Sequence, residues 1–74
     1  MENEYVTAED KINLINNFIK NISYNRYNAY LALLAETAVQ DPNQSNIDNY
    51  TNQIEQFDAK ILALQNELLS VEGE

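Results

Sequence analysis

The stretch "IDNYTNQIEQFDAKILALQNELLSV", residues 47 to 71, decides the fold. Its apolar residues recur at alternating intervals of three and four, at Ile47, Tyr50, Ile54, Phe57, Ile61, Leu64, Leu68 and Val71. A helical turn of 3.6 residues brings such positions onto one side, and an unbroken alternation over about four heptads is typical of a coiled-coil seam. The stretch therefore predicts a long amphipathic helix from about residue 46 to about residue 71.

The first half of the chain has the same helical period. Its apolar stripe comprises Ile12, Ile15, Ile19 and Ile22 and continues to about residue 40. Thr7 can cap this helix, and Glu9 and Asp10 fall in the first turn, where the helix dipole favours negative charge. We therefore expect a first helix over about residues 8 to 40.

A break separates the two predicted helices at "QDPNQS", residues 40 to 45. Pro42 stops the first helix, since the residue before a proline avoids the α region. Ser45, followed by Asp48 three residues later, resembles a capping box for the second helix. We expect a turn over about residues 41 to 45 within a single domain, 1 to 74, with flexible ends. The fold class predicted is all-α: an antiparallel, coiled-coil-like hairpin of two helices.

A hairpin places residues equidistant from the turn opposite each other, so that the numbers of facing residues add to about 86 or 87. The expected pairs are Leu33 with Ile54, Ile22 with Leu64, Ile19 with Leu68, and Ile15 with Val71. Every pair is apolar on apolar. The two stripes, found independently, therefore agree in register.

A second group of apolar residues lies outside this seam. Tyr24, Tyr27, Leu31, Leu34 and Ala38 lie roughly 120° around the first helix from the seam, with Tyr30 between; Leu14, Phe18, Leu62 and Leu69 also lie outside it. One interpretation is that the tyrosines only cover the edge of the hairpin, with their hydroxyls in water. We favour an interface, because a thin hairpin has no enclosed core and a leftover apolar face is best explained by association. We expect a homodimer that forms a four-helix bundle, with a trimer as the next choice, or docking to another protein.

Arg26 is the one charged residue predicted within the seam, where the register puts it near Ile61. An unpaired charge buried there would be costly. We expect it to pair with Asp58 or with an acid from a neighbouring subunit, and to fix the helix register. The alternative is that its stem packs while the guanidinium reaches solvent.

The composition excludes several classes of function. The chain has no cysteine and no histidine, and its 12 acidic residues outnumber its four basic ones, for a net charge of −8. Such a balance argues against nucleic acid and against anionic membranes as partners. The acids are too sparse to imitate DNA phosphates, and no cleft of carboxylates, metal-binding spacing or phosphate loop is present. We therefore expect no enzyme activity, no metal and no cofactor. There is no signal-peptide pattern at the N-terminus, so we expect no secretion by that route.

In pattern and composition the chain resembles small helical-hairpin proteins of tailed bacteriophages, which are rich in asparagine and isoleucine. The resemblance covers "EDKINLINNFIKNISYNRYNAYLALLAE", the turn "DPNQSNI" and "QIEQFDAKILALQNELLSV". It implies a structural component of the virion, or an assembly helper such as a tail-fibre chaperone, located in the virion or in the cytoplasm of a bacterial host. Two other hypotheses remain open. One is an inhibitor or adaptor that binds a host protein; the other is an oligomeric sponge for small ligands such as nucleotides, held between subunits near Arg26 and the tyrosines.

Overall fold

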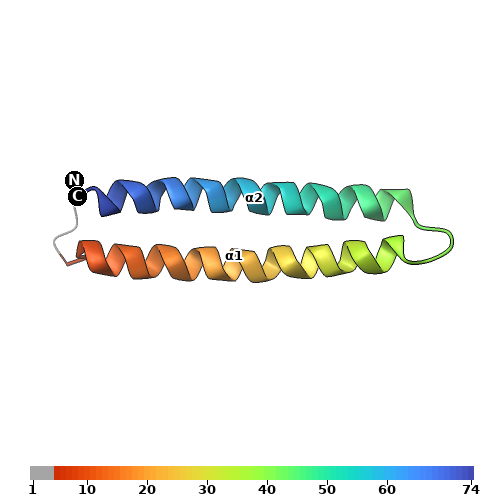
Figure 1. Ribbon diagram of the computed structural model, residues 1–74, viewed down its shortest axis with the longest axis horizontal. Helices are drawn as coiled ribbons and strands as arrows, with labels where there is room; N and C mark the ends of the chain where they lie inside the picture. The colour runs from red at the N-terminus through yellow and green to blue at the C-terminus, as the bar shows by residue number, and fades with distance from the viewer. Residues whose placement is uncertain (1–4) are drawn as a thin grey trace.

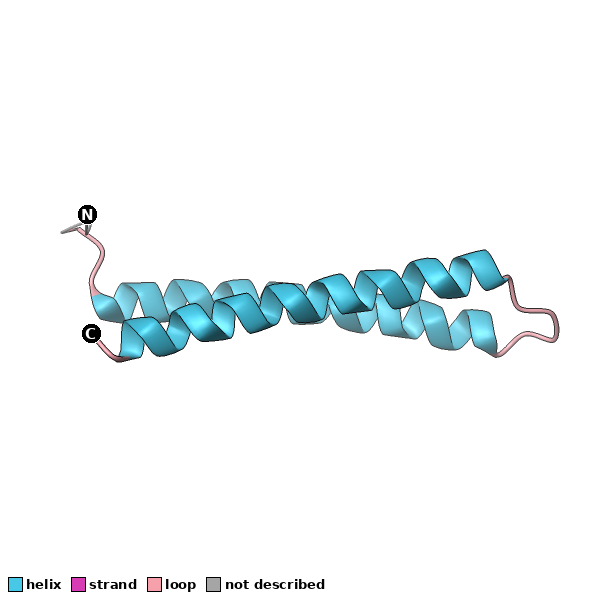
Figure 2. Cartoon of the chain, turned by 90° about the horizontal axis from the view of Figure 1, so that it is seen from above, coloured by secondary structure: helices cyan, strands magenta, loops and turns pink. Residues whose placement is uncertain are grey.

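The computed structural model describes residues 5 to 74, which form an antiparallel pair of long helices (Figure 1). Helix α1 spans Ala8–Thr37 and helix α2 spans Gln44–Glu72. The described residues contain no strand, which confirms the predicted all-α hairpin. Seen from above, the two helices cross at a shallow angle (Figure 2). The predicted flexibility of the N-terminal end concerns residues 1 to 4, which lie outside the described part of the chain.

Helix α1 begins where the sequence predicts and ends earlier. Thr7 is the N-cap: its hydroxyl accepts a hydrogen bond from the Asp10 backbone N–H at 3.1 Å, and the Asp10 carboxylate accepts one from the Thr7 N–H at 3.2 Å. This reciprocal capping box satisfies two N–H groups that lack partners within the helix. At the other end, the Thr37 hydroxyl donates to the carbonyls of Leu33 and Leu34. The helix ends at Thr37, three residues before the predicted end, where the Thr37 hydroxyl competes with backbone N–H groups for the carbonyls of the last turn.

Helix α2 begins earlier than predicted, and the expected cap at Ser45 is wrong. Asn43 is the N-cap, and its side chain accepts a hydrogen bond from the Asn46 N–H at 3.2 Å. Asp48 does not complete a capping box with Ser45; its carboxylate accepts a hydrogen bond from the Gln44 side chain at 2.9 Å. Asparagine caps about as well as serine, and a cap directly after Pro42 lets the helix start two residues sooner.

The seam between the helices is mostly half-buried. All eight apolar seam positions of α2 are buried or half-buried, and almost every other position of that helix is exposed. In the described chain, only Ile15, Ala29 and Val71 are buried. Val71 is the least exposed of them, at 2%. Burial of Ala29 was not predicted, since its small side chain did not stand out in the apolar stripe.

Two ion pairs that join the two halves of the hairpin show the register in which the helices pack. Arg26 pairs with Asp58, and Lys11 pairs with Glu74. The residue numbers of these pairs add to 84 and 85, close to the predicted 86 to 87. The two pairs are far apart along α1, so their agreement shows that the register is constant along the hairpin.

The hairpin is a thin rod, 56 by 16 by 15 Å, with a radius of gyration of 16.8 Å. A compact domain of this length would have a radius of gyration of about 11 Å. The chain exposes 5667 Å², whereas a compact monomer of 8.5 kDa exposes about 4,700 Å². The rod therefore carries on the order of 1,000 Å² more surface than a compact protein of the same mass.

Candidate protein-interaction surface

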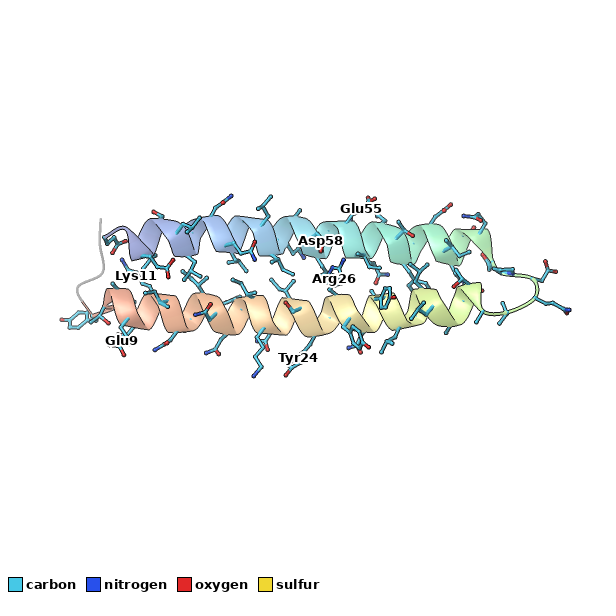
Figure 3. The ribbon with its side chains drawn as sticks, viewed as in Figure 1. Glu9, Lys11, Tyr24, Arg26, Glu55 and Asp58 are labelled. Atoms are coloured by element: carbon cyan, nitrogen blue, oxygen red, sulfur yellow. The ribbon has the colours of Figure 1, made fainter. Side chains whose placement is uncertain are left out.

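The main apolar surface lies on α1, on the side turned away from the seam. We call it the tyrosine face; it comprises Tyr24, Tyr27, Tyr30, Leu31, Leu34 and Ala38. All six residues are exposed, with exposed fractions of 60% for Tyr24, 57% for Tyr27 and 46% for Leu34. Figure 3 shows the Tyr24 side chain pointing away from α2. Nothing in residues 5 to 74 covers this face, although it extends over more than three turns of helix.

Contacts along α1 hold the tyrosine rings in place. The rings of Tyr27 and Tyr30 lie 6.1 Å apart with a tilt of 32° between their planes. The Lys20 ammonium lies 5.9 Å from the centre of the Tyr24 ring, within the range of a cation–π contact. Neighbours three and four residues apart on a helix are in reach of each other, so these contacts follow from the spacing. The tyrosine side chains are therefore held by contacts within α1 in the unbound protein.

The other four residues of the predicted interface are also exposed but do not extend the tyrosine face into one continuous surface. They are Leu14, Phe18, Leu62 and Leu69, exposed like the tyrosines. At 100° per residue, Leu14 and Phe18 fall on the flank of α1 opposite the tyrosines. Leu62 and Leu69 lie on α2. Two further apolar residues that were not predicted as part of the interface, Tyr5 and Val39, are also exposed, and they precede and follow α1.

Arg26 and Asp58 face each other between the helices (Figure 3). The Arg26 Nε donates to one carboxylate oxygen of Asp58 at 2.5 Å, and a terminal guanidinium nitrogen lies 3.4 Å from the other. This hydrogen bond and the negative charge raise the pKa of Arg26 above its ordinary value. The two side chains remain 40% and 52% exposed. The pair thus lies at the edge of the seam, in contact with solvent, and the buried position considered for Arg26 is wrong because the guanidinium extends past the apolar side chains.

A hydrogen-bonded clamp, which was not predicted from the sequence, closes the turn. The Glu36 carboxylate accepts hydrogen bonds from the Asn43 backbone N–H at 3.1 Å and from the Asn46 side-chain amide at 3.0 Å. These bonds favour the charged form and lower the pKa of Glu36. The signal in the sequence was an acid in the last turn of α1 followed by two asparagines around the start of α2. Glu36 therefore joins the end of α1 to the start of α2.

Pockets and clusters of metal-binding side chains are the other features that could form a site in the described residues. Residues 5 to 74 have no pocket, and no three His, Cys, Asp or Glu side chains in that range are grouped so that they could hold a metal. Neither α1 nor α2 is apolar enough over sufficient length to cross a membrane. The tyrosine face is thus the strongest candidate for a functional site in this part of the chain.

Comparison of the chain with protein-family models, with curated proteins and with solved structures finds no match. No relative therefore supplies a function.

Proposed function

We propose that this chain is a non-enzymatic structural or assembly protein that acts through helix–helix contacts with other protein molecules. The observation that carries the proposal is the exposed tyrosine face of α1. Isolated apolar side chains are normal on a protein surface, but a contiguous row marks a site of interaction. Tyrosine is enriched in such sites because it buries a large ring while its hydroxyl keeps a polar contact.

The rod shape supports the same proposal. Each helix is covered by its partner along one side only, so that every seam residue except the three buried ones keeps some contact with water. Burial of apolar surface contributes about 25 cal/mol per Å². Docking a further helix on the tyrosine face would therefore stabilise both the complex and the hairpin itself.

Within this function, the resemblance to small phage hairpins favours a virion component or an assembly chaperone for a tail or fibre. Mass spectrometry of purified virions distinguishes the two roles. A structural component is present in a fixed ratio to the major proteins, while a chaperone is absent from virions but present in infected cells. A chain that is absent from virions and bound to a host protein would instead be an inhibitor or adaptor.

Photo-crosslinking tests the proposed surface. The change is Leu31 to p-benzoylphenylalanine in the cell that naturally produces the protein, with Gln56 changed in the same way as the control. Gln56 is exposed and lies on a polar part of α2. We expect discrete protein adducts from position 31 and none from position 56. A folded protein that gives no adduct from position 31 would overturn the proposal.

A further inference from the structure

We infer that the partner on the tyrosine face is a second copy of this chain, with α1 packed antiparallel against α1 of the other copy and a two-fold axis near Leu31. The inference rests on the proposed function and names its partner. It is carried by three features of the face: the order of its side chains by size, the placement of charge, and the surface area that the rod leaves uncovered.

Side-chain size decreases along the face from one end to the other. Tyr24, Tyr27 and Tyr30 come first, Leu31 and Leu34 follow, and Ala38 comes last, with Ala35 at the edge of the face beside it. All seven are exposed. Antiparallel packing about Leu31 places each tyrosine against an alanine of the other copy, Tyr24 opposite Ala38 and Tyr27 opposite Ala35. Parallel packing would set tyrosine against tyrosine and leave a gap between the alanines, contrary to the close packing that protein interfaces require.

Charge is complementary at both ends of the face. Lys20 lies one turn before Tyr24 on the same side of α1, and Asp41 follows Ala38 in the turn. The antiparallel arrangement that pairs Tyr24 with Ala38 also brings Lys20 near Asp41 of the other copy. The two-fold axis repeats this contact, so that an ion pair forms at each end of the interface.

The overall distribution of charge also favours contact through α1. Helix α1 has three acidic and three basic residues, while α2 has five acidic residues and one lysine. Two copies of a chain with a net charge of −8 repel each other. Packing α1 on α1 keeps the two acidic helices on the outside of the dimer, where they are farthest apart and screened by salt.

The area fits a dimer of this kind. The rod exposes on the order of 1,000 Å² more than a compact monomer, so burying the roughly 800 Å² per partner of a standard interface would bring its exposed surface close to that of a compact protein. The helical part of this stretch, from Lys20 to Thr37, is about 26 Å long at 1.5 Å per residue. An interface of this length leaves the outer side of α2 free for contacts with other molecules.

Site-directed cross-linking tests the orientation, since the natural chain has no cysteine that would react. Two single-cysteine variants, Tyr24→Cys and Ala38→Cys, carry different tags and are mixed at micromolar concentration. A short bis-maleimide reagent then spans the gap of about 8–10 Å between packed helices. We expect Tyr24→Cys to link to Ala38→Cys at least several times more than either variant links to itself. Leu31→Cys alone should give homodimers, while Phe18→Cys, on the other flank, should stay uncross-linked.

Sedimentation of the unmodified chain provides the second measurement, with Tyr27→Ser as a variant that keeps the seam intact. We expect a dimer for the natural chain and at least a tenfold weaker dimer for the variant. Predominant links of position 24 to position 24, or dimers joined through Phe18, would overturn the inference while the proposed function stands. A monomer whose position 31 cross-links only to a different protein would also overturn the inference and leave the proposed function standing. A monomer with no adduct at all would overturn both.

Discussion

Val71→Ala gives the most direct test of how the rod is held together. Val71 is 2% exposed although it lies in the last turn of α2, where a helix end would ordinarily fray. The substitution removes two methyl groups, each worth about 0.8 kcal/mol when buried. Alanine is the better helix former, and this offsets roughly 0.5 kcal/mol of the loss. We therefore expect the free energy of unfolding to fall by about 1 kcal/mol.

The assay is thermal unfolding followed by circular dichroism, with all variants at one protein concentration because association shifts the midpoint. For a chain of this length, a loss of about 1 kcal/mol lowers the melting temperature by about 4–8 °C. Leu69→Ala is the matched control: Leu69 lies two residues away and is 67% exposed, so its truncation should change the free energy by less than about 0.5 kcal/mol. Equal effects at the two positions would refute the argument from burial.

Two further predictions concern the polar contacts between the helices. Arg26→Leu should change the melting temperature little, because the pair with Asp58 is open to solvent and a leucine fills the same part of the seam; Arg26→Ala should lower it more, because the packed stem is also lost. If the pair sets the register, both variants should broaden the distribution of oligomers in sedimentation, and an unchanged distribution would count against that role. For Glu36, the folded-state pKa is below the unfolded value, so its contribution is present above about pH 4.5 and is lost as the pH falls through the folded pKa. Glu36→Gln should therefore unfold at a lower temperature than the natural chain at pH 7, and this difference should shrink as the pH falls below 4.5, as measured by calorimetry; a difference that does not change with pH would contradict the clamp.

The sequence predicted the seam because its signal is periodic. Eight apolar positions repeat without a break in the second half, so a single polar residue out of place in the stripe would have been obvious. The predicted pairing of Arg26 with Asp58 likewise followed from register, since a charge on an apolar stripe has few acids in reach. The size-ordered tyrosine face could be placed on α1 for the same reason, as a second stripe displaced from the first.

The turn could not be predicted in the same way, because its structure depends on individual hydrogen bonds. Ser45 and Asn43 are about equally good caps, and the local pattern favoured Ser45 because Asp48 follows it at the spacing of a capping box. The contact of Glu36 with Asn43 and Asn46 is what selects the earlier start of α2. That contact joins residues from both helices, so it becomes visible only once the chain reverses direction.

The clamp at the turn also determines the order in which the two ends of the hairpin fold. Glu36 and Asn43 are 7 residues apart, whereas Lys11 and Glu74, at the open end, are 63 apart. Closing the longer loop first would cost about 2 kcal/mol more in chain entropy. The contacts between the helices therefore form first at the turn and then progressively towards the open end. In stopped-flow denaturant jumps, Glu36→Gln should slow refolding while Val71→Ala mainly speeds unfolding, and the reverse assignment would show that the hairpin nucleates at its open end.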